Sequence, residues 1–208
     1  LGYDAAALGD QEFSNGPEFL LAAREAFPAL GSANLHWVGR SLAPAGSGLL
    51  GRNGFSVLVL PITGTEAFAL FPEEFRRSLE VSDPLSLLRG RLGAERPDIV
   101  LMAYHGGLSE ARALEASSRA ILAERYGEAA PELFVAASHE NTVQPAPPKG
   151  RRDRTAYVDS SPRERIEGLP KESRLFVFGR GGNRIGRIVV ARPFLGSPWG
   201  SRPAPAVL

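Results

Sequence analysis

The 208-residue chain contains no cysteine and only three histidines. The lack of cysteine excludes disulfide bonds, thiolate metal ligands, a thiol nucleophile and covalently attached c-type haem within this chain. No apolar run approaches the roughly 20 residues that a membrane-spanning helix needs. A formal net charge of +1 gives no argument for nucleic acid or a membrane surface as a partner. The remaining composition is that of an ordinary globular protein with room for one sizeable domain.

The stretch with the clearest chemical signal is DIVLMAYHGG, residues 98–107, in which an apolar run leads to a histidine and two glycines. Residues 99–103 are continuously apolar rather than alternating, which predicts a short strand buried on both faces. In layered α/β proteins, ligands bind at the carboxyl ends of such strands. The glycine pair leaves room beside the His105 ring. His105 is therefore a candidate site residue, and a core histidine at a strand end is the alternative.

A second histidine follows a predicted strand in the same way. Residues 132–137 form another short apolar run, and His139 and Asn141 come just after it. Two of the three histidines then lie at strand ends, which we expect on neighbouring strands. Neutral imidazoles together with a carboxylate suit Zn, Mn, Fe or Ni. Because Asp10 is an available carboxylate, the sequence predicts a metal or catalytic site.

Asp10 belongs to a tight loop near the start of the sequence. Residues 5–8 are apolar, and turns are predicted at Gly9-Asp10 and again at residues 14–16. Pro17 suits the first turn of a helix, which the apolar spacing that follows supports. The acidic residues Asp10 and Glu12 therefore come between a strand and a helix. Capping of that helix is the alternative role for these carboxylates.

The central part of the sequence predicts an α/β fold. Residues 55–60 form a buried strand that we expect Pro61 to end. Asp83 is a plausible cap for a helix that begins at Pro84. Because this helix leads into the strand at residues 99–103, the order strand, helix, strand predicts a βαβ unit and a parallel or mixed sheet. Further helices are predicted at residues 17–27 and 108–126.

The other segments predict turns, loops and short strands. Residues 46–54 are glycine-rich but lack the phosphate-binding patterns GxxxxGK[ST] and GxGxxG, and they predict a hairpin turn. We expect a break at Pro72 in the helical pattern around it. The basic, proline-rich residues 145–154 predict a solvated loop, with a phosphate or an anionic partner as the alternative. Strands at residues 174–178 and 187–191 predict a hairpin.

Several motifs together resemble the 5′-nucleotidase and 2′,3′-cyclic-nucleotide phosphodiesterase family of metallophosphoesterases. LGYDAAALGDQEFSNG is similar to a family segment that usually reads GYDA-x-x-LGNHEFDYG, and DIVLMAYHGG is similar to its strand-His-Gly motif. ASHENT falls where the family's GHxH motif is expected, and GRGGNRIGRIVV resembles its closing hairpin. The resemblance implies a metallophosphoesterase-like layered α/β sandwich, with mixed β-sheets flanked by helices. It covers residues 1–192 as a partial domain and leaves residues 193–208 as an extended tail.

The resemblance also implies the roles of the site residues. Asp10, His105 and His139 would belong to one of the two metal positions, and Asn141 takes the place of a histidine of the other. Asp10 stands where the family has a metal-binding Asn. Gln11 stands where the family has its catalytic His, and an amide cannot supply a proton near neutral pH. Asn141 is a far weaker ligand than histidine for a transition metal.

The family's upstream DxH and GD motifs have no counterpart in this sequence, so the bridging carboxylate is absent from it. A two-metal site works by clamping the attacking and leaving oxygens together. With one half removed, we expect that mechanism to fail, and we expect at most one divalent metal, drawn from Mn, Zn, Fe or Mg. The sequence begins at Leu1 without a methionine, which is consistent with a processed or partial product.

Three functions remain open. In the first, the chain is a degenerate, non-catalytic binding or structural subunit. In the second, it is a metal-dependent phosphoester hydrolase that acts on nucleotides and is completed by an N-terminal segment or a partner chain. In the third, one metal serves other hydrolytic or redox chemistry. Without the first strands, such a sheet would expose an edge and an apolar face. We therefore expect another chain or an N-terminal segment to cover it. The resemblance also implies export, to the periplasm or the cell surface.

Overall fold

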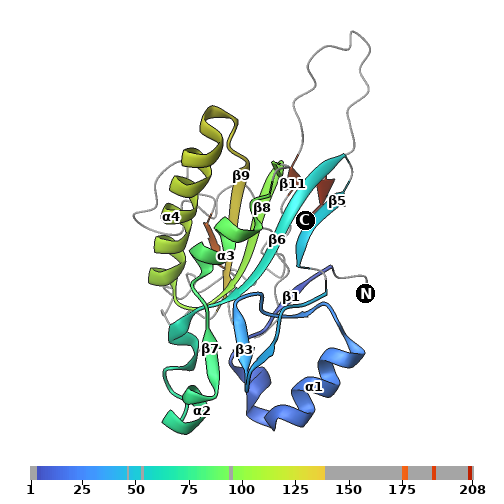
Figure 1. Cartoon of the computed structure of the whole chain (residues 1–208), viewed down its shortest axis with the longest axis vertical. Coiled ribbons are helices and arrows are strands. Elements are labelled where there is room, and N and C mark those ends of the chain that lie inside the picture. Colours follow the sequence, from blue (N-terminus) through green and yellow to red (C-terminus); the bar gives the residue numbers. More distant parts are fainter. Residues whose placement is uncertain are drawn as a thin grey trace, which may run out of the picture.

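The computed structural model describes residues 4–45, 47–52, 54–93 and 96–138 and the short segments 175–177, 189–190 and 206–207. These residues have a mixed α/β fold built on a five-stranded sheet of order β10-β9-β8-β6-β5 (Figure 1). Its strands are β5 (Gly48–Arg52), β6 (Phe55–Thr63), β8 (Ile99–His105), β9 (Glu132–Ser138) and β10 (Leu175–Val177). Four of them run parallel and β5 runs antiparallel to β6. The α/β class and the mixed sheet are confirmed.

Two helices, α3 (Pro84–Arg91) and α4 (Leu108–Tyr126), cover one face of this sheet. Alternate strand residues point to opposite faces. The helix-facing set forms the main core with Leu88 of α3 and Leu122 of α4; it comprises Leu58, Leu60, Ile62, Val100, Met102, Tyr104, Leu133, Val135 and Ala137. The other face forms a second cluster that includes Val57, Ile99 and Phe134. Burial of β8 on both faces is therefore confirmed.

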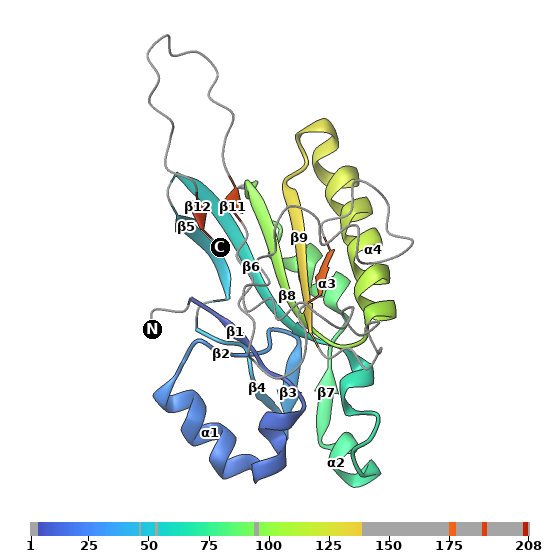
Figure 2. The same cartoon turned by 180° about the vertical axis from the view of Figure 1, so that it is seen from behind.

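A smaller unit lies at one end of the large sheet (Figure 2), and its core includes a cluster of aromatic side chains. Its elements are β1 (Ala6–Ala7), α1 (Gly16–Ala26), β2 (Leu30–Gly31), β3 (Leu35–Trp37), β4 (Arg40–Ser41), α2 (Glu73–Arg77), β7 (Leu79–Val81) and the 3-10 turns Gln11–Asn15 and Thr65–Phe68. β1 pairs in parallel with β2, and β3 pairs antiparallel with β4 and β7. The rings of Phe13, Trp37, Phe68 and Phe75 meet in tilted and edge-to-face contacts. This cluster joins the two 3-10 turns to β3 and α2.

The small unit and the large sheet are joined by a buried polar residue, Asn34. Its Oδ1 accepts hydrogen bonds from Ser32 Oγ at 2.8 Å and from Thr63 N at 3.0 Å. Its Nδ2 donates to the carbonyl oxygens of Thr63 and Ser82, each at 3.0 Å. Thr63 Oγ1 in turn donates to Leu8 O. Asn34 is only 1% exposed, so its side chain replaces water for all of these groups.

Several helix predictions are confirmed with their causes. Asp83 caps α3, because its carboxylate accepts from Leu85 N and Ser86 N. α4 spans Leu108–Tyr126 as its composition predicts, and a short 3-10 turn (Gly127–Ala129) follows it. The break at Pro72 lies between the turn Thr65–Phe68 and α2.

Three strand predictions are wrong. β6 does not end at Pro61 but continues to Thr63. β5 does not reach as far as Pro61, because its first residue, Gly48, pairs with Val59. The carbonyl oxygen of Pro61 accepts from Ala33 N instead, so the missing N–H of proline interrupts no pairing with β5. Most of residues 46–54 form the strand β5 rather than a turn, and the chain reverses between Arg52 and Phe55. The segments at 174–178 and 187–191 do not pair with each other where described: β10 pairs with β9, and β11 (Val189–Val190) pairs with β12 (Ala206–Val207). The tail therefore contributes a strand.

The turn between β3 and β4 contains an unfavourable backbone conformation. Val38 has φ of 50°, a region that β-branched residues rarely adopt, and its side chain is 72% exposed. Gly39 follows with φ of 74°. Replacing Val38 by asparagine, which tolerates this region, is expected to raise the free energy of unfolding by about 0.5–1 kcal/mol.

Chemical denaturation of the Val38→Asn chain would measure this gain. Val38→Ala is the matched comparison, because it removes the β-branch but still places an ordinary side chain at positive φ. If Val38→Asn instead lowers the free energy of unfolding, the Val38 side chain makes stabilising contacts that outweigh the backbone strain.

Candidate functional site

The structure brings Asp10 and His105 together from positions 95 residues apart. His105 Nε2 lies 3.0 Å from Asp10 Oδ1, and the two side chains are 15% and 19% exposed. The backbone N–H of Asp10 also approaches the same ring nitrogen, at 3.3 Å. An imidazole nitrogen and a carboxylate oxygen therefore converge at a partly exposed position. The structure thus places two of the predicted site residues in contact.

Strand ends hold His105 in place. It is the last residue of β8, and its carbonyl oxygen accepts from Gly64 N just after β6. Asp10 follows β1, which lies against β6 and β8. A Cβ atom added to Gly9 would lie 2.7 Å from His105 Cε1. Glycine at position 9 is therefore what allows the backbone before Asp10 to lie so close to the imidazole ring.

The capping alternative for the acidic loop does not hold for Asp10. Its side chain makes no cap hydrogen bond to the 3-10 turn that begins at Gln11, and α1 has Asn15 at its N-cap, also without a side-chain bond. Glu12 instead accepts from Gly9 N at 2.8 Å, which closes the loop on itself. The two neighbouring carboxylates thus have different roles: Glu12 shapes the loop, and Asp10 faces His105.

The other predicted ligands, His139 and Asn141, lie outside the described residues. The residue before His139 is informative, because Ser138 ends β9 and is the register partner of His105. The expectation that both strands end side by side is confirmed. Within the residues that the structure describes, no group of three or more His, Cys, Asp or Glu side chains has metal-site geometry. Gln11 is exposed at the start of its 3-10 turn.

Imidazole nitrogen and carboxylate oxygen are ligand types that divalent ions accept, but in this structure Asp10 and His105 contact each other directly. Two ligand atoms that each lie about 2.1 Å from one ion, about 90° apart, are about 3.0 Å from each other. The Nε2 to Oδ1 distance of 3.0 Å is equally that of a direct hydrogen bond, and Nε2 also accepts the Asp10 N–H, so this distance alone does not mark an ion site. Imidazole nitrogen with carboxylate oxygen suits Zn, Mn or Fe better than the all-oxygen set that Mg prefers.

Sequence reasoning missed a second group of polar residues beside this site. Tyr104 Oη donates to Glu110 Oε2 at 2.6 Å, and Thr65 Oγ1 donates to Glu110 Oε1 at 2.7 Å. Burial raises the pKa of Tyr104 far above its usual value, and the hydrogen bond and negative charge of Glu110 and the charge of Glu66 raise it further. Tyr104 therefore stays a donor at all physiological pH values. Its position one residue before His105 was the available signal.

The described part of the chain includes no helix that is both long and apolar enough to cross a membrane. Comparison with models of protein families finds no match to the chain, and comparison with curated proteins finds none.

Proposed function

We propose that the chain is a metallophosphoesterase-like domain with an altered site, which holds at most one divalent metal and serves as a non-catalytic binding or structural subunit. The contact between Asp10 and His105 carries this proposal. These residues come from two of the motifs that resemble the family, and they meet in the folded chain with His105 Nε2 3.0 Å from Asp10 Oδ1. His139, which directly follows β9 in the sequence, would complete the ligand set.

The lack of turnover in this proposal follows from Gln11, the residue next to Asp10. The reaction of a phosphoesterase needs a group that moves a proton or stabilises the leaving oxygen. Gln11 takes that position in the resemblance, and its amide can only donate and accept hydrogen bonds. A bound metal ion would supply Lewis acidity, while Asp10 and His105 would orient it and Gln11 would contact a bound anion without changing its protonation.

A covering partner is part of the same proposal. β1 is a short strand that pairs with β2 along one edge, and within the described residues no strand pairs with its other edge. An edge of this kind is where a further strand adds to a sheet. A segment that carries the family's upstream motifs, from this protein or from a partner, would be suited to this edge. This is also the observation that favours the alternative of a completed, nucleotide-cleaving hydrolase. Export to the periplasm or cell surface remains a prediction from the resemblance.

Metal content measured by mass spectrometry, beside a phosphodiesterase assay with added Mn or Zn, tests the proposal. We expect up to one equivalent of metal and no turnover above background. Turnover with two bound metals would establish the hydrolase alternative. A chain that binds no metal would keep the structural role and remove the metal from the proposal.

Replacing Gln11 by histidine tests why turnover is absent. In a chain joined to a segment with the DxH and GD motifs, we expect Gln11→His to raise hydrolysis of a chromogenic phosphodiester by about tenfold or more, because general acid–base groups contribute about 10²- to 10⁴-fold. Asn15→His, exposed on the same loop, is the matched control and should give no gain. Equal rates for the two variants would contradict the role assigned to position 11.

A further inference from the structure

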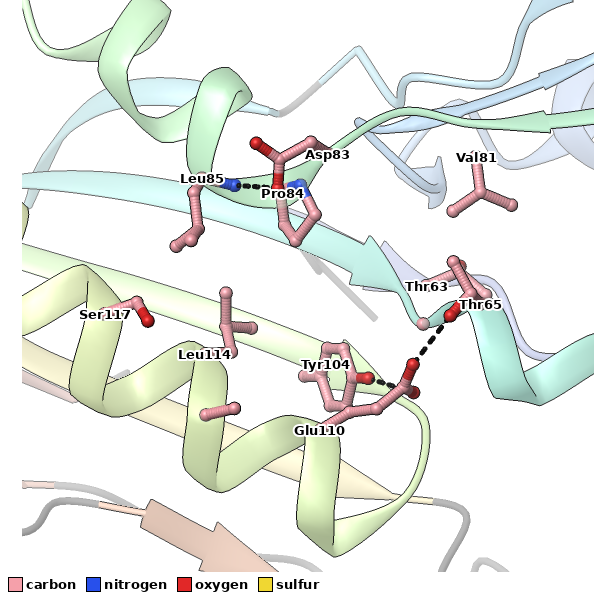
Figure 3. A pocket seen from close by; sticks show the side chains of 12 residues that line it. Thr63, Thr65, Val81, Asp83, Pro84, Leu85, Tyr104, Glu110, Leu114 and Ser117 are labelled. Carbon is pink, nitrogen blue, oxygen red and sulfur yellow. Dashed lines mark hydrogen bonds between the residues drawn. The ribbon is translucent and has the colours of Figure 1, made fainter.

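A pocket of about 240 Å³ lies beside β8, between the start of α3 and the first turns of α4 (Figure 3). Thr63 and Tyr104 line it at the carboxyl ends of β6 and β8. Because successive strand residues point to opposite faces, Tyr104 faces this pocket while His105 faces Asp10. The pocket is therefore separate from the Asp10–His105 contact.

The walls of the pocket are largely apolar. Val81 is the last residue of β7, Leu85 lies in the first turn of α3, and Leu114 projects from α4. Its volume suits a small organic molecule rather than a bare ion. An apolar body in this space would replace water against three aliphatic side chains.

One polar group is fixed in this apolar setting, the carboxylate of Glu110. Tyr104 and Thr65 each donate to one of its two oxygens. A carboxylate has about four acceptor positions, so two hydroxyl donors leave capacity for further donors. A Cβ atom at Gly64 or Gly106 would collide with the Tyr104 hydroxyl, so both glycines are needed for this arrangement. Glu110 is thus held in one orientation before any ligand arrives.

The charge of Glu110 has no basic counterpart among the described lining residues. The other acidic lining residue, Asp83, is already used to cap α3. The side-chain hydrogen bond from Ser86 lowers the pKa of Asp83, helped by the backbone bonds of the cap and by the positive charge of Arg89. The pocket therefore combines an apolar wall with one oriented negative charge, which repels anions and favours a cationic donor.

We propose that this pocket binds a small organic amine in its ammonium form. The ammonium group donates to the carboxylate of Glu110, and the aliphatic body packs against Val81, Leu85 and Leu114. An alcohol of the same shape would keep the apolar contact but lose the charge-assisted hydrogen bond. This inference needs no metal and does not depend on the proposed function.

Titration of the full chain with 3-methylbutylamine, followed by NMR, tests the proposal, with 3-methylbutan-1-ol and 4-methylpentanoate as the uncharged and anionic comparisons. We expect a dissociation constant of about 1 mM for the amine. We expect affinity about tenfold lower or worse for the alcohol, and no binding of the acid. Alcohol and amine binding with equal affinity, or an amine that fails to bind at about 10 mM, would overturn the proposal.

Two variants locate the binding site. Glu110→Gln keeps an oxygen for Tyr104 or Thr65 but removes the charge, and it should weaken amine binding about tenfold. Glu124→Gln, exposed on the same helix, is the matched control and should bind normally. Ser117→Leu places a larger side chain in the pocket and should abolish binding even if Glu110→Gln folds poorly. Unchanged binding in both Glu110→Gln and Ser117→Leu would show that the amine binds elsewhere.

Discussion

Replacing Asn34 by leucine is expected to lower the free energy of unfolding by about 3–5 kcal/mol. Leucine has a similar volume but no polar atoms. It would leave Ser32 Oγ, the backbone N–H and C=O of Thr63 and Ser82 O without their shared partner. Ser32 and Thr63 are at most 1% exposed, so water cannot replace the lost bonds without opening the structure. Each buried group left unpaired costs about 1–3 kcal/mol.

Denaturant unfolding followed by circular dichroism would measure this loss. Asn15→Leu is the matched control, because Asn15 is an exposed N-cap without a side-chain cap bond, and its replacement should change stability by less than about 1 kcal/mol. Asn34→Asp keeps the acceptor but turns a buried carboxylate oxygen toward the carbonyl oxygens of Thr63 and Ser82, so at neutral pH it should be at least as destabilising as the leucine variant. Similar losses at positions 15 and 34 would show that the Asn34 network does not join the two units.

Removal of the imidazole in His105→Ala is expected to lower the affinity for Zn or Mn by about 100-fold or more. In the proposed metal site His105 would supply one of the ligand atoms, and loss of a ligand should cost more than loss of a supporting hydrogen-bond partner, which typically costs about 10- to 100-fold. Isothermal titration calorimetry of the metal-stripped chain would measure this change. His36→Ala is the comparison, because His36 lies in β3 of the small unit. Equal affinity in the two variants would remove His105 from the site.

Gly9→Ala provides a subtler change at the same site. The added methyl group would lie 2.7 Å from His105 Cε1, so the ring must move away from Asp10 although both ligands are still present. We expect weaker metal binding with little change in composition or charge. Gly90→Ala in α3, where the new Cβ meets no atom within 4 Å, is the matched control. Unaltered binding by the Gly9 variant would show that the imidazole adjusts freely.

The sequence predicts those elements whose pattern is local. β8, β9, α3 and α4 combine continuous apolar runs or helical composition with clear end signals such as Asp83 and Gly127. β5 was mistaken for a turn because two glycines weaken its strand pattern and only pairing with β6 makes it a strand. Pro61 was mistaken for a strand end because the sequence does not reveal that β5 pairs with β6 only as far as Val59 and leaves Pro61 without a β5 neighbour. Tertiary pairing decides both cases.

The same distinction applies to the site. Asp10 and His105 were found because each follows an apolar strand and carries a side chain with recognisable chemistry. Glu110 was missed because a glutamate in the first turn of a helix is ordinary in sequence, and only the Tyr104 and Thr65 hydroxyls mark it out. Asn34 was missed for a similar reason. Its four hydrogen bonds link positions up to 48 residues apart, and no local pattern reveals them.

Because Asp10 and His105 lie far apart in the sequence, an ion that binds both residues would stabilise the folded chain relative to the unfolded chain. An unfolded chain would have to close a loop of 95 residues to bring the two side chains together, so it has no comparable affinity for the ion. Any ion that both residues bind then stabilises the native state by mass action, by about 2.7 kcal/mol at a free concentration 100 times the dissociation constant. A chelator should accordingly lower the melting temperature of the ion-bound protein, whether or not a reaction ever takes place there.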